Sequence, residues 1–171
     1  MMTDARGEPS PWIVQWAGLV ASGAPVLDVA AGGGRHSRLF AGRGHPVTSL
    51  DRAPSALPSD LGLEIVQADL EDGSPWPLGE RRFGAVVVTN YLHRPLFPAL
   101  LDALAPGGVL LYETFMVGNE AFGRPRRPEF LLADGELLEV VRGRLSVVAY
   151  EAGPIGSPHR AVTQRIAARR P

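Results

Sequence analysis

The sequence predicts an α/β fold, namely a Rossmann-like, doubly wound sheet of seven strands that is mostly parallel and ends in a C-terminal antiparallel hairpin. Three observations predict it. Short apolar runs alternate with segments of helical pattern, which is typical of parallel strands joined by right-handed crossovers. The first apolar run ends in a glycine-rich turn. The last two runs are separated only by a loop rich in Gly and Pro, which predicts a hairpin.

The apolar runs place the expected strands at 25–30, 46–51, 63–67, 83–89, 109–115, 145–151 and 161–167. The continuous run 83–89 indicates a strand that is covered on both faces. Helical spacing of apolar residues predicts helices at 11–21, 35–44, 96–104 and 134–143. We expect Ser10 and Asp134 to cap the first and last of these helices, whereas residues 69–82 form an irregular connection.

Composition fits one globular domain over residues 1–171, with 45% hydrophobic and 20% charged residues. Within it, we expect an N-terminal cap helix in 1–24 and a lid loop over 116–132. The net charge of −1 makes nucleic acid an unlikely partner. The absence of cysteine excludes disulfides and thiolate metal sites, and we expect no metal. With no apolar leader or membrane-spanning stretch, the expected location is the cytoplasm.

The glycine turn favours a cofactor that carries an ammonium group and no phosphate. Asp28 lies just before the glycines, where its carboxylate would repel a pyrophosphate and would attract an ammonium group, directly or through water. The spacing after Gly32 puts Ser37 where a dinucleotide site has its third glycine, and no P-loop Gly-Lys-Ser/Thr follows. These features predict S-adenosylmethionine and make an NAD-dependent dehydrogenase a distant alternative.

Two further acids follow expected strands at their carboxyl ends. Asp51, about 20 residues after the turn, is placed to accept hydrogen bonds from ribose hydroxyls. Asp69 would accept the adenine amine, and Leu70 would pack on the ring. Asn90, after the fourth strand, either contacts the cofactor or caps the turn.

Several segments resemble the ordered motifs of class I S-adenosylmethionine-dependent methyltransferases. They are 26–37, 50–52, 67–70, 83–92 and 104–110. The resemblance implies cofactor contacts at Asp28, Ala30, Gly32, Gly34, Asp51, Arg52, Asp69, Leu70 and Asn90. Ala30 departs from the family, which usually has glycine there. We expect binding to survive because alanine is small, although its backbone cannot take glycine-only angles.

The residues that could contact the methyl acceptor are marked by weaker sequence patterns than the cofactor residues. His93 is either a base or acceptor contact or a histidine on the rim, and Arg94 is expected to be a solvated charge. Residues 131–136 and the pair His159-Arg160 resemble bacterial tellurite-resistance-type methyltransferases, which implies that His159, Arg160 and Arg165 lie near the acceptor. The alternative is that His159 and Arg160 only form the polar tip of the C-terminal hairpin.

The lid carries Arg124, Arg126 and Arg127, which either attract an anionic acceptor or form a solvated basic loop. Trp12 and Trp16 either cover the cofactor or anchor packing. The leading hypothesis is transfer of a methyl group to a small-molecule acceptor, such as a thiol or a chalcogen oxyanion. The alternatives are an RNA or protein methyltransferase that acts as a homodimer, and a non-catalytic cofactor-binding subunit.

Overall fold

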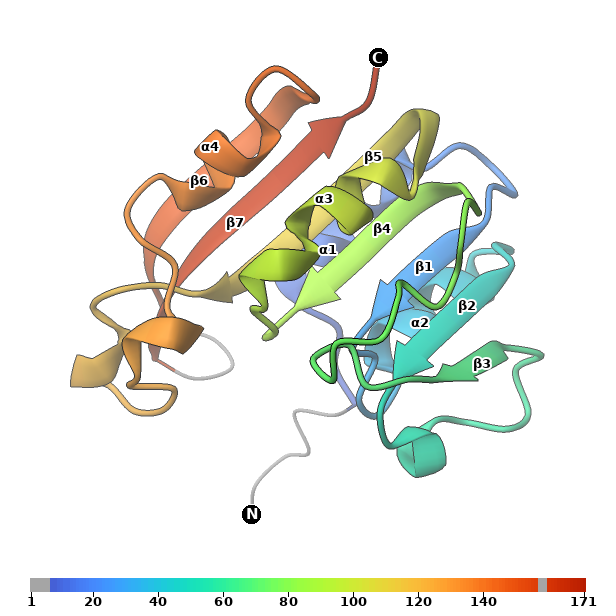
Figure 1. Cartoon of the computed structure of the whole chain (residues 1–171), viewed down its shortest axis with the longest axis horizontal. Coiled ribbons are helices and arrows are strands. Elements are labelled where there is room, and N and C mark those ends of the chain that lie inside the picture. Colours follow the sequence, from blue (N-terminus) through green and yellow to red (C-terminus); the bar gives the residue numbers. More distant parts are fainter. Residues whose placement is uncertain (1–6, 157–159) are drawn as a thin grey trace.

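A computed structural model describes the chain over residues 7–156 and 160–171, and its strands form one seven-stranded sheet (Figure 1). The strand order is β3-β2-β1-β4-β5-β7-β6. The strands are β1 Val26–Val29, β2 Val47–Asp51, β3 Glu64–Gln67, β4 Phe83–Thr89, β5 Leu104–Phe115, β6 Ser146–Ile155 and β7 Ala161–Arg169. The first five run parallel, and β7 pairs antiparallel with both β5 and β6. The predicted fold class is confirmed.

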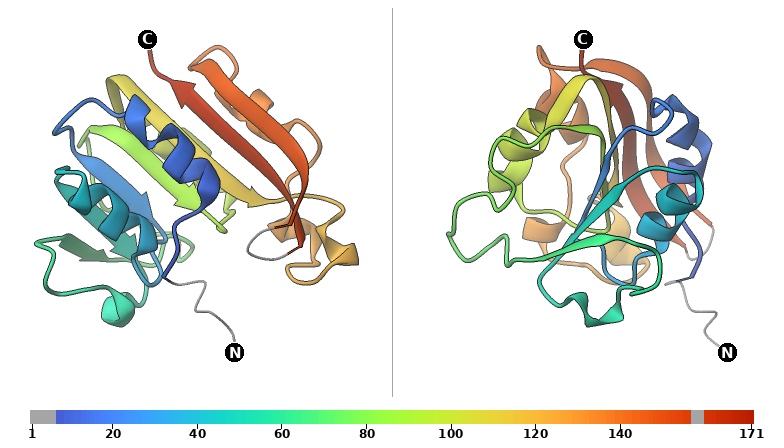
Figure 2. Two further views of the ribbon diagram at one scale, coloured as in Figure 1. Left: turned by 180° about the vertical axis from the view of Figure 1, so that it is seen from behind. Right: turned by 90° about the vertical axis from the view of Figure 1, so that its right-hand side faces the viewer.

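Helices cover both faces of the sheet (Figure 2). The helices α1 (Pro11–Trp16) and α2 (Arg35–Gly42) lie on one face, and α3 (Phe97–Asp102) and α4 (Glu136–Val141) lie on the other. Alternate strand residues therefore enter two separate cores. Val26 and Val87 pack with α1 and α2, whereas Leu27 and Val86 belong to the core under α3 and α4.

The predicted helix caps are wrong. Ser10 is the residue before α1, but its side chain makes no capping bond there, because its hydroxyl donates to Glu113 Oε1 at 2.6 Å. The residue before α4 is Gly135 at φ 70° rather than Asp134. Glycine adopts this left-handed conformation without the penalty that a Cβ imposes.

The strand β5 begins five residues earlier than expected. Its pairing with β4 shifts register after Phe83 and resumes at Ala85, opposite Val109. The intervening Gly107 and Gly108 exchange backbone hydrogen bonds with Arg170 near the end of the chain. Helix α3 ends at Asp102, and the Pro-Gly-Gly segment 106–108, whose position favours a helix stop, lies inside the extended strand β5.

The carboxyl ends of β1, β2, β4 and β5 lie along one edge of the sheet (Figure 1). The loops that follow these strands gather there, as does the segment 116–132 after β5. That segment is held to the fold by a bridge between Met116 and Leu132 and contains two short 3-10 helices, Asn119–Ala121 and Pro128–Phe130. Within the described residues, none of the helices has the length and apolar character needed to cross a bilayer.

Candidate functional site

Two adjoining cavities lie at the carboxyl edge of the sheet. The first has a volume of about 710 Å³ and the second about 570 Å³, within the range of small-molecule sites. Both are lined by Ala30, Asn90 and Phe115, so they meet at this point. The first cavity extends under α1 and β7, and the second lies between the loops after β2, β3 and β4 and the segment 116–132.

The glycine turn after β1 forms the floor where the cavities meet. Ala30 has φ 53°, Gly32 has φ 57° and Gly34 has φ 81°. Ala30 thus adopts a left-handed angle, which is open to a Cβ-bearing residue at a cost of about 1–2 kcal/mol and is not restricted to glycine. Gly34 is required for space as well, since a Cβ there would lie 2.9 Å from Pro58 Cδ.

Asp28 lies beneath the turn, on the sheet face covered by α2. It is 2% exposed and lines neither cavity. Its Oδ2 accepts a hydrogen bond of 2.7 Å from Ser37 Oγ, which lies 2.7 Å from Ser49 Oγ. Burial raises the pKa of Asp28 to about 6, against the opposing effect of the Ser37 hydrogen bonds. The structure thus gives Asp28 no open path to a ligand, and its contact with an ammonium group stays a prediction.

The acids after β2 and β3 do come together, around the second cavity. Asp51, Arg52, Asp69 and Leu70 all line it, together with Asn90. Each carboxylate oxygen of Asp51 accepts one backbone N–H at 2.8 Å, from Gly32 and from Ala53. These bonds tie the glycine turn to the end of β2 and leave further lone pairs for a ligand.

Asn90 is a turn residue at φ 54°, and its backbone N–H donates to the Glu113 carbonyl oxygen at 2.9 Å. It lines both cavities. Of the predicted turn residues, Ala30 also lines both cavities and Gly32 lines the first, whereas Gly34 lines neither.

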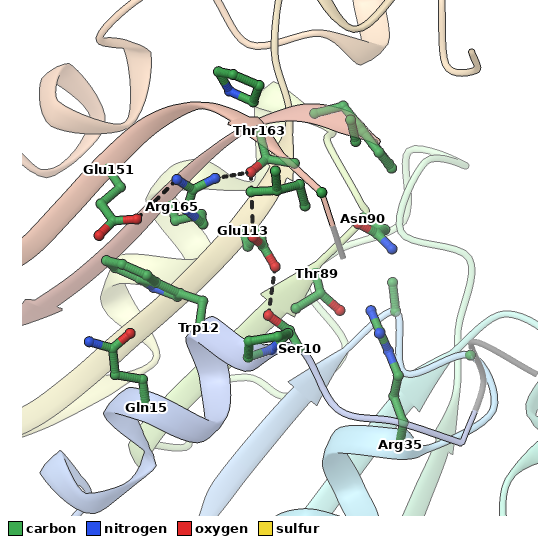
Figure 3. A pocket seen from close by; sticks show the side chains of 18 of the residues that line it. Ser10, Trp12, Gln15, Arg35, Thr89, Asn90, Glu113, Glu151, Thr163 and Arg165 are labelled. Atoms are coloured by element: carbon green, nitrogen blue, oxygen red, sulfur yellow. Dashed lines mark hydrogen bonds and ion pairs between the residues drawn. The ribbon is translucent and has the colours of Figure 1, made fainter. Parts of the chain in front are cut away.

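The first cavity is lined by a polar network that sequence reasoning largely missed (Figure 3). Glu113, on β5, is 9% exposed, and its Oε2 lies 3.4 Å from Thr163 Oγ1, which donates to it. Arg165 Nη1 donates to the same Thr163 oxygen, and Arg165 Nη2 forms an ion pair of 3.0 Å with Glu151. The signal in the sequence was a charged residue inside each of two otherwise buried strands.

Helix α1 closes this network from the other side. The Trp12 ring lies 5.9 Å from the Arg165 guanidinium carbon, and its indole N–H donates to the Ile166 carbonyl. Trp12 therefore packs as an anchor and lines the first cavity at the same time, whereas Trp16 lines neither cavity.

A buried histidine anchors the segment that leads into α1. The Ser10 backbone N–H donates to His36 Nε2 at 3.0 Å, and His36 Nδ1 lies 3.3 Å from Thr89 Oγ1. Burial, helped by the nearby Arg35 charge, lowers the pKa of His36 to about 3. His36 is therefore neutral at pH 7, with Nε2 free to accept the Ser10 bond.

Two of the predicted acceptor residues that the structure describes, His93 and Arg160, line neither of these cavities. His93 lies on a third cavity of about 810 Å³, with its Nδ1 3.6 Å from Glu71 Oε1. Arg160 is exposed, and its guanidinium carbon lies 4.8 Å from the Phe122 ring centre. His159 lies outside the described residues. Between Arg160 and Arg165, the two described residues that the tellurite-resistance resemblance places near the acceptor, Arg165 lines the first cavity and Arg160 does not.

The segment 116–132 contributes apolar side chains rather than charge. Pro125 and Phe130 line the second cavity, while Arg124, Arg126 and Arg127 are exposed. Arg94 is not a solvated charge: its guanidinium binds both Glu136 carboxylate oxygens, at 2.7 and 2.9 Å. It also donates to the carbonyls of Glu129 and Leu131. Arg94 therefore holds the end of this segment in place.

The fold is similar to those of several proteins of known structure. The chain superposes on TehB from Haemophilus influenzae with a TM-score of 0.73 and 18% identity, covering 93% of this chain and 61% of TehB. The glycopeptide N-methyltransferase MtfA, complexed with S-adenosylhomocysteine, gives 0.65 and 23% identity over 92% and 88% of the two chains. The chain has the fold of S-adenosylmethionine-dependent methyltransferases.

A further methyltransferase of this fold acts on a small molecule. It is the 1,6-didemethyltoxoflavin-N1-methyltransferase of Burkholderia thailandensis, with a TM-score of 0.68 and 20% identity over 98% of this chain and 79% of that one. In sequence comparisons, no protein-family model and no curated protein matches the chain. The chain spans only about three fifths of TehB, so the activity of TehB as a whole does not transfer with the fold.

Proposed function

We propose that this protein is a methyltransferase that binds S-adenosylmethionine across the two cavities and methylates a small molecule. The observation that carries the proposal is the meeting of the two cavities at Ala30, Asn90 and Phe115, directly above the glycine turn. In this arrangement the adenosine half occupies the second cavity, and the methionyl half extends into the first. The reactive methyl group then lies where the cavities meet.

The side chains around the second cavity suit an adenosine group. Asp51 still has lone pairs for the ribose hydroxyls after its two backbone bonds. Asp69 offers an acceptor for the adenine amine, and Leu70 and Phe130 supply apolar surface for the ring. Arg52, on the same wall, adds a charge at the ribose end of the cavity.

The methionyl half is zwitterionic, and the first cavity has groups for both charges. Arg35 lines the cavity beside the glycine turn and suits the carboxylate (Figure 3). Asp28 lies beneath the turn and acts on the ammonium group through its charge, without contact. With a pKa of about 6 it is ionised at neutral pH, so its buried charge favours a cationic group above the turn.

Bound S-adenosylmethionine supplies an electrophilic methyl group on a sulfonium. The chain then has to orient an acceptor in line with that group and keep water out. Trp12, Phe115, Pro154 and Ile155 line the first cavity with apolar surface suited to both tasks. No conspicuous base is needed for such a displacement, which leaves the catalytic roles of His93, His159 and Arg160 as predictions.

A thiol or a chalcogen oxyanion is one candidate for the acceptor, and the likeness to TehB is what supports it. The other solved neighbours include N-methyltransferases of a glycopeptide and of a toxoflavin precursor, so the fold itself does not select the acceptor. Two alternatives stay predictions: an RNA or protein acceptor bound by a homodimer, and a non-catalytic cofactor-binding subunit. The cytoplasmic location also stays a prediction.

Calorimetry tests the cofactor. We expect the chain to bind S-adenosylmethionine and S-adenosylhomocysteine and not NAD, and binding of NAD alone would refute the proposal. Asp28→Ala should weaken cofactor binding, because it removes the buried negative charge beneath the turn, and should leave the fold intact by circular dichroism. Asp102→Ala is the matched control, because Asp102 pairs with Arg144 on the surface. Transfer of labelled methyl to any of a panel of thiols, amines, tellurite, selenite and bulk RNA separates an enzyme from a binding subunit.

A further inference from the structure

A row of polar residues crosses four strands beneath the first cavity. The strand register places Glu113 between Thr89 on β4 and Arg165 on β7, and Glu151 on β6 follows Arg165. Residues in register lie on the same face of a sheet, and all four line the cavity. Glu113 lies two residues before Phe115, which marks the meeting point of the cavities.

Glu113 is a buried carboxylate without a direct cationic partner. None of the ion pairs formed within residues 7–156 and 160–171 includes it. Its neighbour in register, Arg165, pairs with Glu151 instead and reaches Glu113 only through the Thr163 hydroxyl. The remaining partner is the Ser10 hydroxyl at 2.6 Å.

Two hydroxyl partners leave this carboxylate incompletely satisfied. An ionised carboxylate accepts about four hydrogen bonds, and a buried charge is costly unless it is paired. Figure 3 shows Glu113 at the centre of the cavity wall, with its bonds to Ser10 and Thr163 on either side. Arg35, on the same cavity wall, interacts with Glu113 electrostatically without forming an ion pair. The group that completes Glu113 comes from the cavity and supplies a hydrogen-bond donor or a positive charge.

We infer that Glu113 binds the nitrogen of an amine acceptor next to the transferred methyl group, so that the substrate class is a primary or secondary amine on an apolar body. The inference rests on the proposed function. An anionic acceptor would be repelled by Glu113, whereas an amine supplies the missing donors. Trp12, Pro154 and Ile155 supply the apolar wall for the rest of the molecule.

The reaction balances with groups that are present. The lone pair of the neutral amine forms an N–C bond to the methyl group, while the C–S bond breaks and its electron pair stays on sulfur. The proton that the nitrogen releases passes to a Glu113 carboxylate oxygen. Ser10 and Thr163 hold that carboxylate in position throughout.

Two cofactor analogues test the position of Glu113 without knowledge of the acceptor. Sinefungin carries a primary amine where the cofactor carries its methyl group, and S-adenosylhomocysteine carries nothing there. We expect the wild type to bind sinefungin about tenfold more tightly than S-adenosylhomocysteine. Glu113→Gln should remove most of that preference and leave the Kd of S-adenosylhomocysteine within about twofold. Glutamine keeps an acceptor for Ser10, and Glu139→Gln, at an exposed position on α4, is the control.

The outcomes separate the two proposals. If wild type binds neither analogue, the proposed function fails. If Glu113→Gln weakens both analogues equally, or neither, Glu113 does not face the methyl position and the inference is overturned. A second assay uses labelled S-adenosylmethionine with benzylamine, benzyl alcohol, phenylmethanethiol and tellurite. Labelled product from the amine alone supports the inference, and product from the thiol or tellurite with none from the amine overturns it.

Discussion

The neutral His36 makes a quantitative prediction about acid stability. In the folded chain its pKa is about 3, whereas an unfolded chain has the ordinary value of 6.5. The folded state therefore binds fewer protons, and the stability from this group is fully present above pH 6.5 and is lost as the pH falls from 6.5 towards 3. Each pH unit in that window costs about 1.4 kcal/mol, so a fall from pH 7.5 to 5.0 costs about 2 kcal/mol.

Asp28 acts in the opposite direction. Its pKa is raised to about 6 from 3.8, so the folded state takes up a proton first and gains stability as the pH falls through 6. That gain is about 1.4 kcal/mol at pH 5.0, which hides much of the His36 effect in the wild type alone. A comparison of the wild type with a His36 variant removes this contribution, because both proteins retain Asp28.

The test is urea unfolding of wild type and His36→Gln at pH 7.5 and 5.0, followed by tryptophan fluorescence. The glutamine side chain would offer its amide oxygen to the Ser10 N–H in place of the histidine Nε2, so the variant should fold and should lack the acid loss. We expect the free-energy difference between the two proteins to shift by about 2 kcal/mol in favour of the variant at pH 5.0. For Asp28→Asn we expect the opposite: the free-energy difference between wild type and variant should shift in favour of the wild type at pH 5.0. A difference that stays constant between the two pH values would refute the reasoning.

Three further substitutions probe the site. Asp51→Ala should weaken binding of S-adenosylhomocysteine about tenfold or more by calorimetry, and a Kd within twofold of wild type would exclude its role. Gly34→Ala should lower the free energy of unfolding by at least about 1 kcal/mol, because its Cβ would lie 2.9 Å from Pro58. Gly42→Ala, with open space around it, is its control. Arg94→Leu should free the segment 116–132 and speed tryptic cleavage there, and an unchanged rate would show that other contacts hold it.

The sequence was sufficient for the fold because its signals are local. Each strand run, the glycine turn after β1 and the irregular connection 69–82 depend on neighbouring residues. The acids of the second cavity could be predicted in the same way. Asp51 and Asp69 follow adjacent parallel strands, so they lie at the same edge of the sheet. Ser10 and Asp134 failed as caps because a side chain near a helix start has other partners, and only packing shows which one it takes.

For the first cavity the sequence carried only a charged residue inside each of β5 and β7, which does not show that the two side chains meet. Ser10 and Glu113 are 103 positions apart, and their 2.6 Å bond exists because the segment before α1 crosses the end of β5. Arg165 stands beside Glu113 only because β7 inserts between β5 and β6 in reversed direction. The sequence alone therefore determined the glycine turn and the acids of the second cavity, which arise from short-range patterning and parallel register. The tertiary structure decided the first cavity, because its charges are brought together by strand order and by a terminal segment that packs across the sheet.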